Sequence, residues 1–301
     1  MKNLTLLMCG VLVFFLFSCN KDNNEEDKAK AATELYYCAW KDSLVGKIEL
    51  NNGNLNSIVA KGIADNISGR GPNGITTDGT NLYVALEVND GAILKISTTG
   101  TVTVLYSGVD ATIKPTAIVY NKKNNMLYWI SEDASKIYYA NTNGTGTPTS
   151  LFGNESIEAD GYGLDIDLKT NKIYFTDWDN IWVGNLDGTG TPTKLYNTIY
   201  DTIESPSSIL VDNTNNRLYY TDENTNVVAY ANLDGTGNFH ILFDYDNDDV
   251  DRADGLAIDF VTNKIYWSET FSGRIRVGNL DGTGTPTTLL IQDEVYKIIL
   301  K

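Results

Sequence analysis

The chain has 301 residues, and its 39 acidic residues against 23 basic ones give a formal net charge of −16. A surface of this sign repels polyanions, so we expect no nucleic-acid partner. The three cysteines and the single histidine form no CxxC motif and no Cys/His cluster, so we expect neither a disulfide framework nor a structural zinc site.

The first segment, residues 1–18, has the composition of a signal peptide. Lys2 precedes an apolar run at 4–17, which is shorter than an ordinary membrane span. The run ends in the sequence LFSC, which resembles a bacterial lipobox, where cleavage falls before a cysteine that then carries a lipid. We therefore predict lipidation at Cys19. The alternative is an ordinary signal peptide followed by an incidental cysteine.

Residues 19–32 are polar and charged and contain no aromatic side chain, which predicts a flexible tether. The acidic run after Cys19 also resembles the export signal of Bacteroidetes surface lipoproteins. We expect a protein held at the outer membrane or the cell surface by its lipid. Its periplasmic or surface-exposed orientation stays open. Cys38 stands alone in a strand pattern and is expected to be a small buried side chain.

Six tyrosines recur through the rest of the chain, each inside a β-rich pentad. The steps between them are 47, 45, 46, 45 and 47 residues, and a fixed period of this size is typical of an array of like units. A glycine turn follows each pentad, and four of these turns are near-copies of one Asn/Asp-Gly loop, which is a strong hairpin signal. The pentads are LYYCA at Tyr36, LYVAL at Tyr83, LYWIS at Tyr128, IYFTD at Tyr174, LYYTD at Tyr219 and IYWSE at Tyr266.

Each unit contains about four short runs rich in Ile, Leu, Tyr, Val or Thr, bounded by Gly, Asn or Asp. Six such units predict an all-β fold over residues 33–301, a six-bladed β-propeller with four antiparallel strands per blade. The first unit lacks a preceding strand, and an extra run, VYKIILK at 295–301, follows the last unit. We therefore expect the ring to close by this C-terminal strand joining the first blade.

The pentads and their spacing resemble the YWTD repeats of six-bladed propellers of the low-density-lipoprotein-receptor type. The resemblance spans residues 33–301 and is strongest at IYFTD, LYYTD and IYWSE, each followed by an NLDG turn. It implies the same fold, with the repeated positions joining neighbouring blades rather than forming a functional site. The acidic last position of the pentad is kept as Asp177, Asp222 and Glu269 but is Ala39, Leu86 and Ser131 in the first three units.

One face of such a ring carries the loops that differ between units, and function is expected there. These are the loops from the second to the third strand of each unit and the connections between units. Large aromatic and basic side chains in them suit a protein hot spot or stacking on a sugar, although each ring could instead pack on its own blade. The candidates are Trp40, Arg70, Lys114, Tyr162, Trp178, Arg252 and Phe271.

The acidic run at 244–255 offers half of a calcium-loop motif. Asp244, Asp246 and Asp248 have the spacing of its first ligands, but the sixth position lacks Gly and the twelfth lacks Glu. A solvated acidic connection is the alternative that we favour, so we expect no cofactor, with Ca²⁺ as the one metal suggested by the pattern. The single His240 lies in an outer-strand run and has no second histidine for a relay.

These observations favour a monomeric cell-envelope lipoprotein that acts as a non-catalytic binding module for a protein or glycan. The alternative is a metal-dependent hydrolase, similar to the lactonases built on six-bladed propellers, which uses the central channel. Asp165 is the clear polar candidate for that channel, because the equivalent positions in the other units are mostly apolar. A purely structural envelope protein is the third hypothesis.

Overall fold

The computed structural model of the protein describes residues 30–52, 55–63, 69–88, 91–108, 114–153, 159–196 and 203–301. The predicted signal peptide, Cys19 and most of the predicted tether lie outside these residues. The contacts separate residues 1–30 from a compact unit at Ala31–Lys301, and all that follows concerns this unit. Within the described residues, no helix has the length and apolar character needed to cross a membrane.

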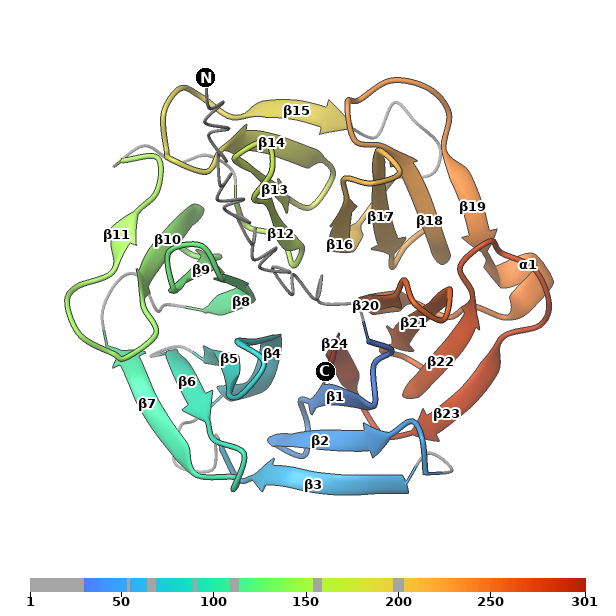
Figure 1. The fold of residues 1–301 in the computed structure, drawn as a ribbon, viewed down its shortest axis with the longest axis horizontal. Helices are drawn as coiled ribbons and strands as arrows, with labels where there is room; N and C mark the ends of the chain where they lie inside the picture. The colour runs from blue at the N-terminus through green and yellow to red at the C-terminus, as the bar shows by residue number, and fades with distance from the viewer. Residues whose placement is uncertain are drawn as a thin grey trace, which may run out of the picture. The chain divides into compact units, whose positions relative to one another are not determined.

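The compact unit is a six-bladed β-propeller, as the repeat predicted. Six antiparallel sheets of four strands surround a central axis (Figure 1). Blade 1 contains β24 (Val295–Leu300), β1 (Glu34–Ala39), β2 (Leu44–Glu49) and β3 (Leu55–Lys61). Blade 2 contains β4 (Gly69–Thr77), β5 (Leu82–Val88), β6 (Ala92–Ile96) and β7 (Val102–Ser107). Blade 3 contains β8 (Pro115–Asn121), β9 (Met126–Ser131), β10 (Lys136–Asn141) and β11 (Thr149–Ser150).

The second half of the ring repeats this arrangement. Blade 4 contains β12 (Leu164–Asp167), β13 (Lys172–Thr176), β14 (Ile181–Asn185) and β15 (Thr193–Tyr196). Blade 5 contains β16 (Pro206–Asp212), β17 (Arg217–Asp222), β18 (Val227–Asn232) and β19 (His240–Phe243). Blade 6 contains β20 (Ala253–Asp259), β21 (Lys264–Glu269), β22 (Arg274–Asn279) and β23 (Thr287–Ile291). The short helix α1 (Tyr245–Asp248) lies in the connection between blades 5 and 6.

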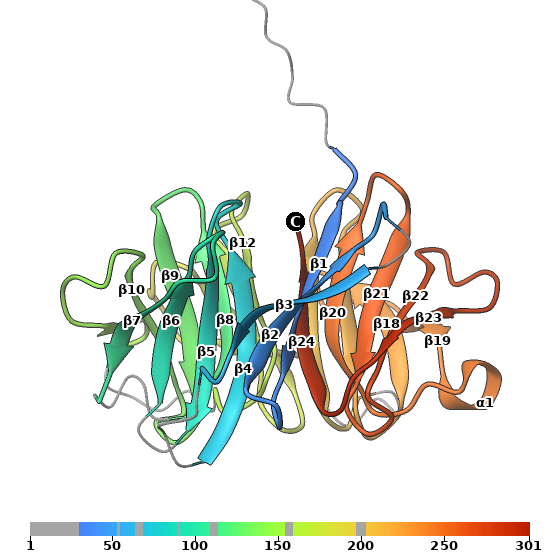
Figure 2. The same cartoon turned by 90° about the horizontal axis from the view of Figure 1, so that it is seen from below.

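The ring closes where its two ends meet, and this prediction is also confirmed. The C-terminal strand β24 pairs antiparallel with β1, so that Leu35 faces Leu300 and Tyr37 faces Ile298 (Figure 2). Beyond the ladder, the backbone of Lys301 bonds in both directions with Glu34. Closure removes the exposed edge that an open row of sheets would present to other chains.

The residue after each repeated tyrosine forms the core between blades. Because side chains alternate along a strand, the tyrosine and its successor point to opposite faces of the blade, and both faces are covered by neighbours. The six successors are all almost fully buried, at 0 or 1% exposure: Tyr37, Val84, Trp129, Phe175, Tyr220 and Trp267.

The fourth residue of the pentad joins the inner strands of neighbouring blades. The Thr221 hydroxyl accepts from the Ser208 N–H of its own blade at 3.1 Å and donates to the Asp254 carbonyl of blade 6. Ser268 repeats this arrangement between Gly255 and the Tyr296 carbonyl of β24. Cys38 occupies the same pentad position in blade 1 and is buried, as expected.

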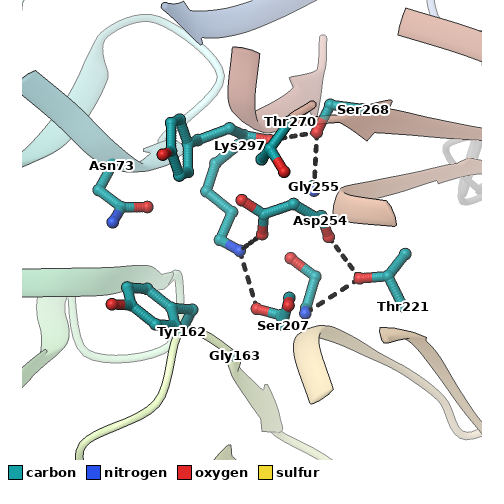
Figure 3. A network of polar contacts seen from close by, with 12 residues as sticks. Asn73, Tyr162, Gly163, Ser207, Thr221, Asp254, Gly255, Ser268, Thr270 and Lys297 are labelled. Carbon is teal, nitrogen blue, oxygen red and sulfur yellow. Dashed lines mark hydrogen bonds and ion pairs between the residues drawn. The ribbon is translucent and has the colours of Figure 1, made fainter. Parts of the chain in front are cut away.

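These joints explain why the inner strands bulge near one end. The pairing register shifts between Ala253 and Leu256 in β20, where a Cβ on Gly255 would lie 2.4 Å from the Tyr296 carbonyl oxygen. Only glycine allows this close approach. The bulge turns the side chain of Asp254 towards the axis of the ring, where the candidate site lies (Figure 3).

Candidate functional site

The variable loops lie at one end of the ring, which we call the divergent face. The described parts of the loops from second to third strand and of the blade-to-blade connections are at this end. One of them contains α1, which lies at the bottom of Figure 2. The near-identical glycine turns and the C-terminus are at the opposite end, which we call the turn face. The divergent face therefore carries the residues that differ from blade to blade.

A buried ion pair occupies the axis near the divergent face. The Lys297 ammonium of β24 pairs with the Asp254 carboxylate of β20 and donates to the Ser207 carbonyl of β16 at 2.8 Å (Figure 3). Lys297 is 6% exposed and Asp254 is 1% exposed. The pair therefore joins blades 1, 5 and 6 in surroundings that exclude most water, where each charge depends on the other.

A second polar pair lies across the axis, on blade 2. The Asn73 amide donates to the Glu87 carboxylate at 2.5 Å, and both residues are buried. Among the described residues, no donor reaches the other amide atom, Oδ1 of Asn73. Figure 3 shows this oxygen directed towards the axis, on the side where Lys297 and Tyr162 lie. A buried acceptor of this kind costs free energy unless water or a ligand donates to it.

Two more charged groups surround the axial pair. The Arg252 guanidinium bonds to the Glu223 carboxylate at 2.8 Å. Burial raises the pKa of Glu223, and the nearby Asp254 charge raises it further. Burial likewise raises the pKa of Asp254, although Lys297 opposes this effect. The pKa of Tyr296 rises to about 12, first through burial and then through the negative charge of Asp254.

Aromatic rings border this charged centre. Tyr162 makes an edge-on contact with Trp178 at 5.5 Å, and the Lys297 ammonium lies 5.8 Å from the centre of the Tyr162 ring. Trp178 is 48% exposed and Phe271 is 77% exposed, so both reach solvent as the sequence suggested. Trp40 differs, because its ring packs on Tyr296 at 5.6 Å and is only partly exposed. Tyr296 belongs to β24, so Trp40 packs on its own blade, which is the alternative that the sequence left open, and its contact with a ligand stays a prediction.

The other residues that the sequence suggested for ligand or metal binding lie away from the axis, or their side chains are not among those that the structure describes. Lys114 pairs with Asp133 at 2.7 Å within blade 3. Arg70 belongs to β4, but its side chain is not among those the structure describes. The metal candidates lie in and before α1, where Asp244 caps the helix by accepting from the Asn247 N–H. Within the described residues, no three His, Cys, Asp or Glu side chains gather as a metal-binding group, and Asp244, Asp246 and Asp248 are no exception.

The central channel behind the axial pair is narrow. Its cavity measures about 110 Å³ and is lined largely by apolar side chains of the inner strands, with Lys297 and Tyr162 among its walls. Asp165 supplies a carboxylate to this wall, but its two oxygens accept from the backbone N–H groups of Val211 and Ile166, at 2.7 and 2.8 Å. This carboxylate therefore links blades 4 and 5, and both of its oxygens are already hydrogen-bonded instead of being available to a metal.

Asp165 gives the protein a testable dependence on pH. Partial removal from water raises the pKa of Asp165 to about 6, so the folded chain holds a proton that the unfolded chain releases near pH 4. The free energy of unfolding should therefore fall as pH rises from about 4 to about 6, by at most about 3 kcal/mol from this group. Urea denaturation across this range is the measurement.

Asp165→Asn is the matched variant for that experiment. The difference in unfolding free energy between this variant and the unchanged chain isolates the contribution of Asp165. The difference in unfolding free energy should depend on pH between about 4 and 6 and be flat above. Capped carboxylates such as Asp78, whose pKa is lowered to about 2, change stability with the opposite sign and below this range. Parallel pH profiles for the two proteins would refute the assignment.

The sequence missed the centre of the site. The sequence pattern places Lys297 in the closing strand and Asp254 in the acidic run at 244–255, but it does not indicate that the two meet. A lysine inside the apolar run VYKIIL was the available signal. Its partner could not be named, because Asp254 lies on a different blade and faces it only after the ring closes.

The comparisons with known proteins support the fold. No family model and no curated protein matches the chain. A chain of the nidogen/laminin complex is similar in structure, with a TM-score of 0.73, 16% identity, and coverage of 89% of this chain and 97% of that one. The likeness establishes the fold alone.

Other solved structures are more distant. Virginiamycin B lyase from Staphylococcus aureus matches with a TM-score of 0.53 and 17% identity over 72% of this chain and 69% of that one. A protein of unknown function from Bacteroides thetaiotaomicron matches with a TM-score of 0.60 and 16% identity over 76% of this chain and 64% of that one. Proteins with this architecture therefore include an enzyme and a member of a protein complex, and the fold does not choose between these roles.

Proposed function

We propose that this chain is a non-catalytic binding module that takes a protein or glycan ligand at the divergent face. The observation that carries the proposal is the exposure of two large aromatic side chains, Trp178 and Phe271, in loops at the end of the ring that holds the axial charge pair. Exposed aromatic rings in short loops at the ends of strands bury large apolar areas on binding and lose little conformational freedom.

The surroundings of Trp178 suit an anchor of this kind. Its edge-on contact with Tyr162 holds the ring in place, while almost half of its surface remains open to a partner. The polar centre beside it supplies Arg252 and the unmatched acceptor of Asn73, which can fix the orientation of a ligand. An apolar anchor next to a few directed polar groups is the usual composition of a specific binding site.

Two further points support a protein as the ligand. The sequence repeats resemble YWTD propellers, and a structural neighbour was solved as part of the nidogen/laminin complex. The lactonase-like alternative receives no such support. The described channel wall offers one central carboxylate, already bonded to two backbone N–H groups, and His240 lies on the outer strand β19, away from the axis.

We also propose that the protein is a lipoprotein of the bacterial cell envelope, tethered through Cys19 to the outer membrane or cell surface. The lipobox-like sequence at Cys19 and the polar segment after it support this placement. Cell fractionation of the Cys19→Ser variant tests it, because the variant should leave the membrane fraction. Membrane association unchanged by the substitution would refute the lipid anchor.

Alanine substitutions at Trp178 and Phe271 test the binding face. A glycan array and a panel of purified envelope proteins, probed with the intact protein, should identify a ligand whose affinity falls about tenfold or more in each variant. The melting temperature should hardly change, because neither ring is part of the core.

Val104→Ala is the matched control for that experiment. Val104 is 56% exposed on the outer strand β7, so its substitution removes an exposed apolar side chain far from the axis. Binding should be unchanged in this variant. Ligand affinity that is equal in all three variants and the unchanged chain would show that the divergent face is not the binding surface.

A further inference from the structure

A large groove separates blades 5 and 6 at the turn face, on the opposite side of the ring from the proposed ligand site. Its volume is about 1180 Å³, somewhat above the roughly 300–1,000 Å³ of sites for single small molecules, so it has room for an oligomeric ligand. The corresponding grooves between blades 3 and 4 and between blades 1 and 2 measure about 390 and 250 Å³. The repeat alone therefore does not explain the size of this groove.

Two cations, Arg217 and Lys264, line the groove with no carboxylate at ion-pair distance, although the charges of Asp212 and Asp281 act on them from nearby. Lys264, the first residue of β21, donates to the Asn279 amide oxygen at 2.7 Å, and Lys172 makes the same contact with Asn185 in blade 4 at 2.8 Å. Arg217 holds the equivalent position in blade 5. Among the described ion pairs, none includes Arg217 or Lys264.

The Arg217 side chain lies over an aromatic wall. Its guanidinium carbon lies 4.1 Å from the centre of the Tyr230 ring, and its Nη1 donates to the Tyr219 hydroxyl at 3.1 Å. The His240 ring stacks on Tyr230 at 4.7 Å with an angle of 16° between the planes. Tyr219, Tyr230 and His240 face one another across neighbouring strands. Phe260, which is 45% exposed, lies on the opposite wall and contacts Tyr219.

Only the histidine of this wall is particular to blade 5. Blade 3 has a similar pair of stacked tyrosines, Tyr128 and Tyr139, followed by Thr149. In blade 5, Tyr219 of the second strand pairs with Tyr230 of the third, which pairs with His240 of the fourth. The positions of Tyr230 and His240 are held by Val183 and Thr193 in blade 4, and by Val277 and Thr287 in blade 6. Those blades fold with the small residues, so the propeller does not require an imidazole at His240. Its presence beside a stacked arginine is better explained by a ligand.

Two acidic residues of the groove, Asp212 and Asp281, accept hydrogen bonds from residues of the turns in which they lie. Asp212 accepts from the backbone N–H groups of Thr214 and Asn215, at 2.9 and 3.2 Å. Asp281 accepts from the N–H and the hydroxyl of Thr283, at 3.0 and 2.7 Å. Neither carboxylate forms an ion pair with Arg217 or Lys264, and both add acceptors to the groove wall.

We propose that this groove binds a saccharide that carries a carboxylate, a sugar of the uronic acid type. The planar guanidinium of Arg217 and the ammonium of Lys264 match a carboxylate. The exposed rings of His240 and Phe260 match the apolar face of a sugar, and the surrounding amides and carboxylates accept from its hydroxyl groups. An acidic peptide offers the carboxylates but no sugar ring whose apolar face could pack on these side chains.

Calorimetric titration of the intact protein with trimers of galacturonic, glucuronic and mannuronic acid tests the proposal. At least one acidic trimer should bind, and its neutral counterpart, in which each carboxylate is replaced by a hydroxymethyl group, should bind about tenfold more weakly or not at all. Triglutamate should bind more weakly than the acidic sugar. Absence of binding by all the acidic trimers, or equal binding of the neutral sugars or of triglutamate, would overturn the proposal.

Lys264→Ala and Lys172→Ala form a matched pair of variants. Both remove a lysine that holds the same asparagine contact, but only Lys264 lines the groove. Affinity should fall about tenfold in Lys264→Ala and stay within about twofold in Lys172→Ala. His240→Thr restores the residue of the neighbouring blades and should also weaken binding. Equal losses in the two lysine variants would assign the effect to stability and reject the site.

The two binding proposals can fail separately. Trp178 and Phe271 lie at the divergent face, so their alanine variants should keep the affinity for the acidic sugar unchanged. Loss of sugar binding in those variants would place the sugar at the axis instead of the groove and would also overturn the inference drawn here.

Discussion

A chain that ends at Glu294 is expected to lose its cooperative fold. The truncation removes β24, and with it the buried side chains of Val295 and Ile298, each of which contributes about 1.5–3 kcal/mol when buried. It also leaves Asp254 without Lys297, at a cost of about 3–5 kcal/mol for a broken buried pair. These losses are comparable with the whole stability of a typical domain, which is about 5–15 kcal/mol. Near-ultraviolet circular dichroism and thermal melting are the measurements.

A separate peptide of residues 293–301 provides the control for the truncation. Added in excess to the shortened chain, it can pair with the exposed edge of β1 and return Lys297 to Asp254. The melting transition should reappear and shift upward with peptide concentration, as mass action requires. A truncated chain that melts like the intact one would refute the closure on which the fold and the site depend.

Lys297→Met should destabilise the protein by about 3–5 kcal/mol at neutral pH. Methionine has a similar length but leaves the Asp254 carboxylate buried without a cation, and the Ser207 carbonyl loses its donor. The cost should shrink as pH falls, because Asp254, whose pKa burial already raises, can then bind a proton. Urea denaturation at several pH values measures both effects.

The double variant Lys297→Met with Asp254→Asn separates the pair from its surroundings. With both charges removed, no uncompensated ion remains, and most of the lost stability should return. The sum of the two single losses should therefore clearly exceed the loss in the double variant. Additive losses would mean that the two groups act independently, in which case the axial pair does not join blades 1, 5 and 6.

Closure and function are linked through the same strand. β24 brings Tyr296 against Trp40 and Lys297 against Asp254, so the centre of the divergent face exists only when the ring is shut. A ligand that contacts this centre should in turn favour the closed ring over any opened form. The binding proposal and the closure therefore share one physical basis, although Trp178 and Phe271 can be tested without disturbing it.

The fold could be predicted because the same strand and turn pattern occurs six times in the sequence. Each pentad has its own turn and its own buried successor to the tyrosine, and local spacing was enough to give the strands, the blades and the closing segment. The exposed rings of Trp178 and Phe271 were also predictable, since each lies just beyond a strand end, where alternation no longer buries it. For Trp40, packing on its own blade was one of two alternatives, but its partner Tyr296 could not be named, because it lies about 250 residues away in sequence.

The amino-acid sequence by itself determined the number of blades, the pairing of strands within them and the end of the ring that carries variable loops, because a period and a strand alternation are local properties of a chain. Only the tertiary structure decided which polar side chains meet. Closure of the ring brings Lys297 to Asp254 and directs Asn73 towards the axis. Packing of blade 5 on blade 6 places Arg217 and Lys264 in one groove. Such contacts depend on distances between segments that no local pattern encodes, and the charges at the axis persist there because each partner removes the cost of burying the other.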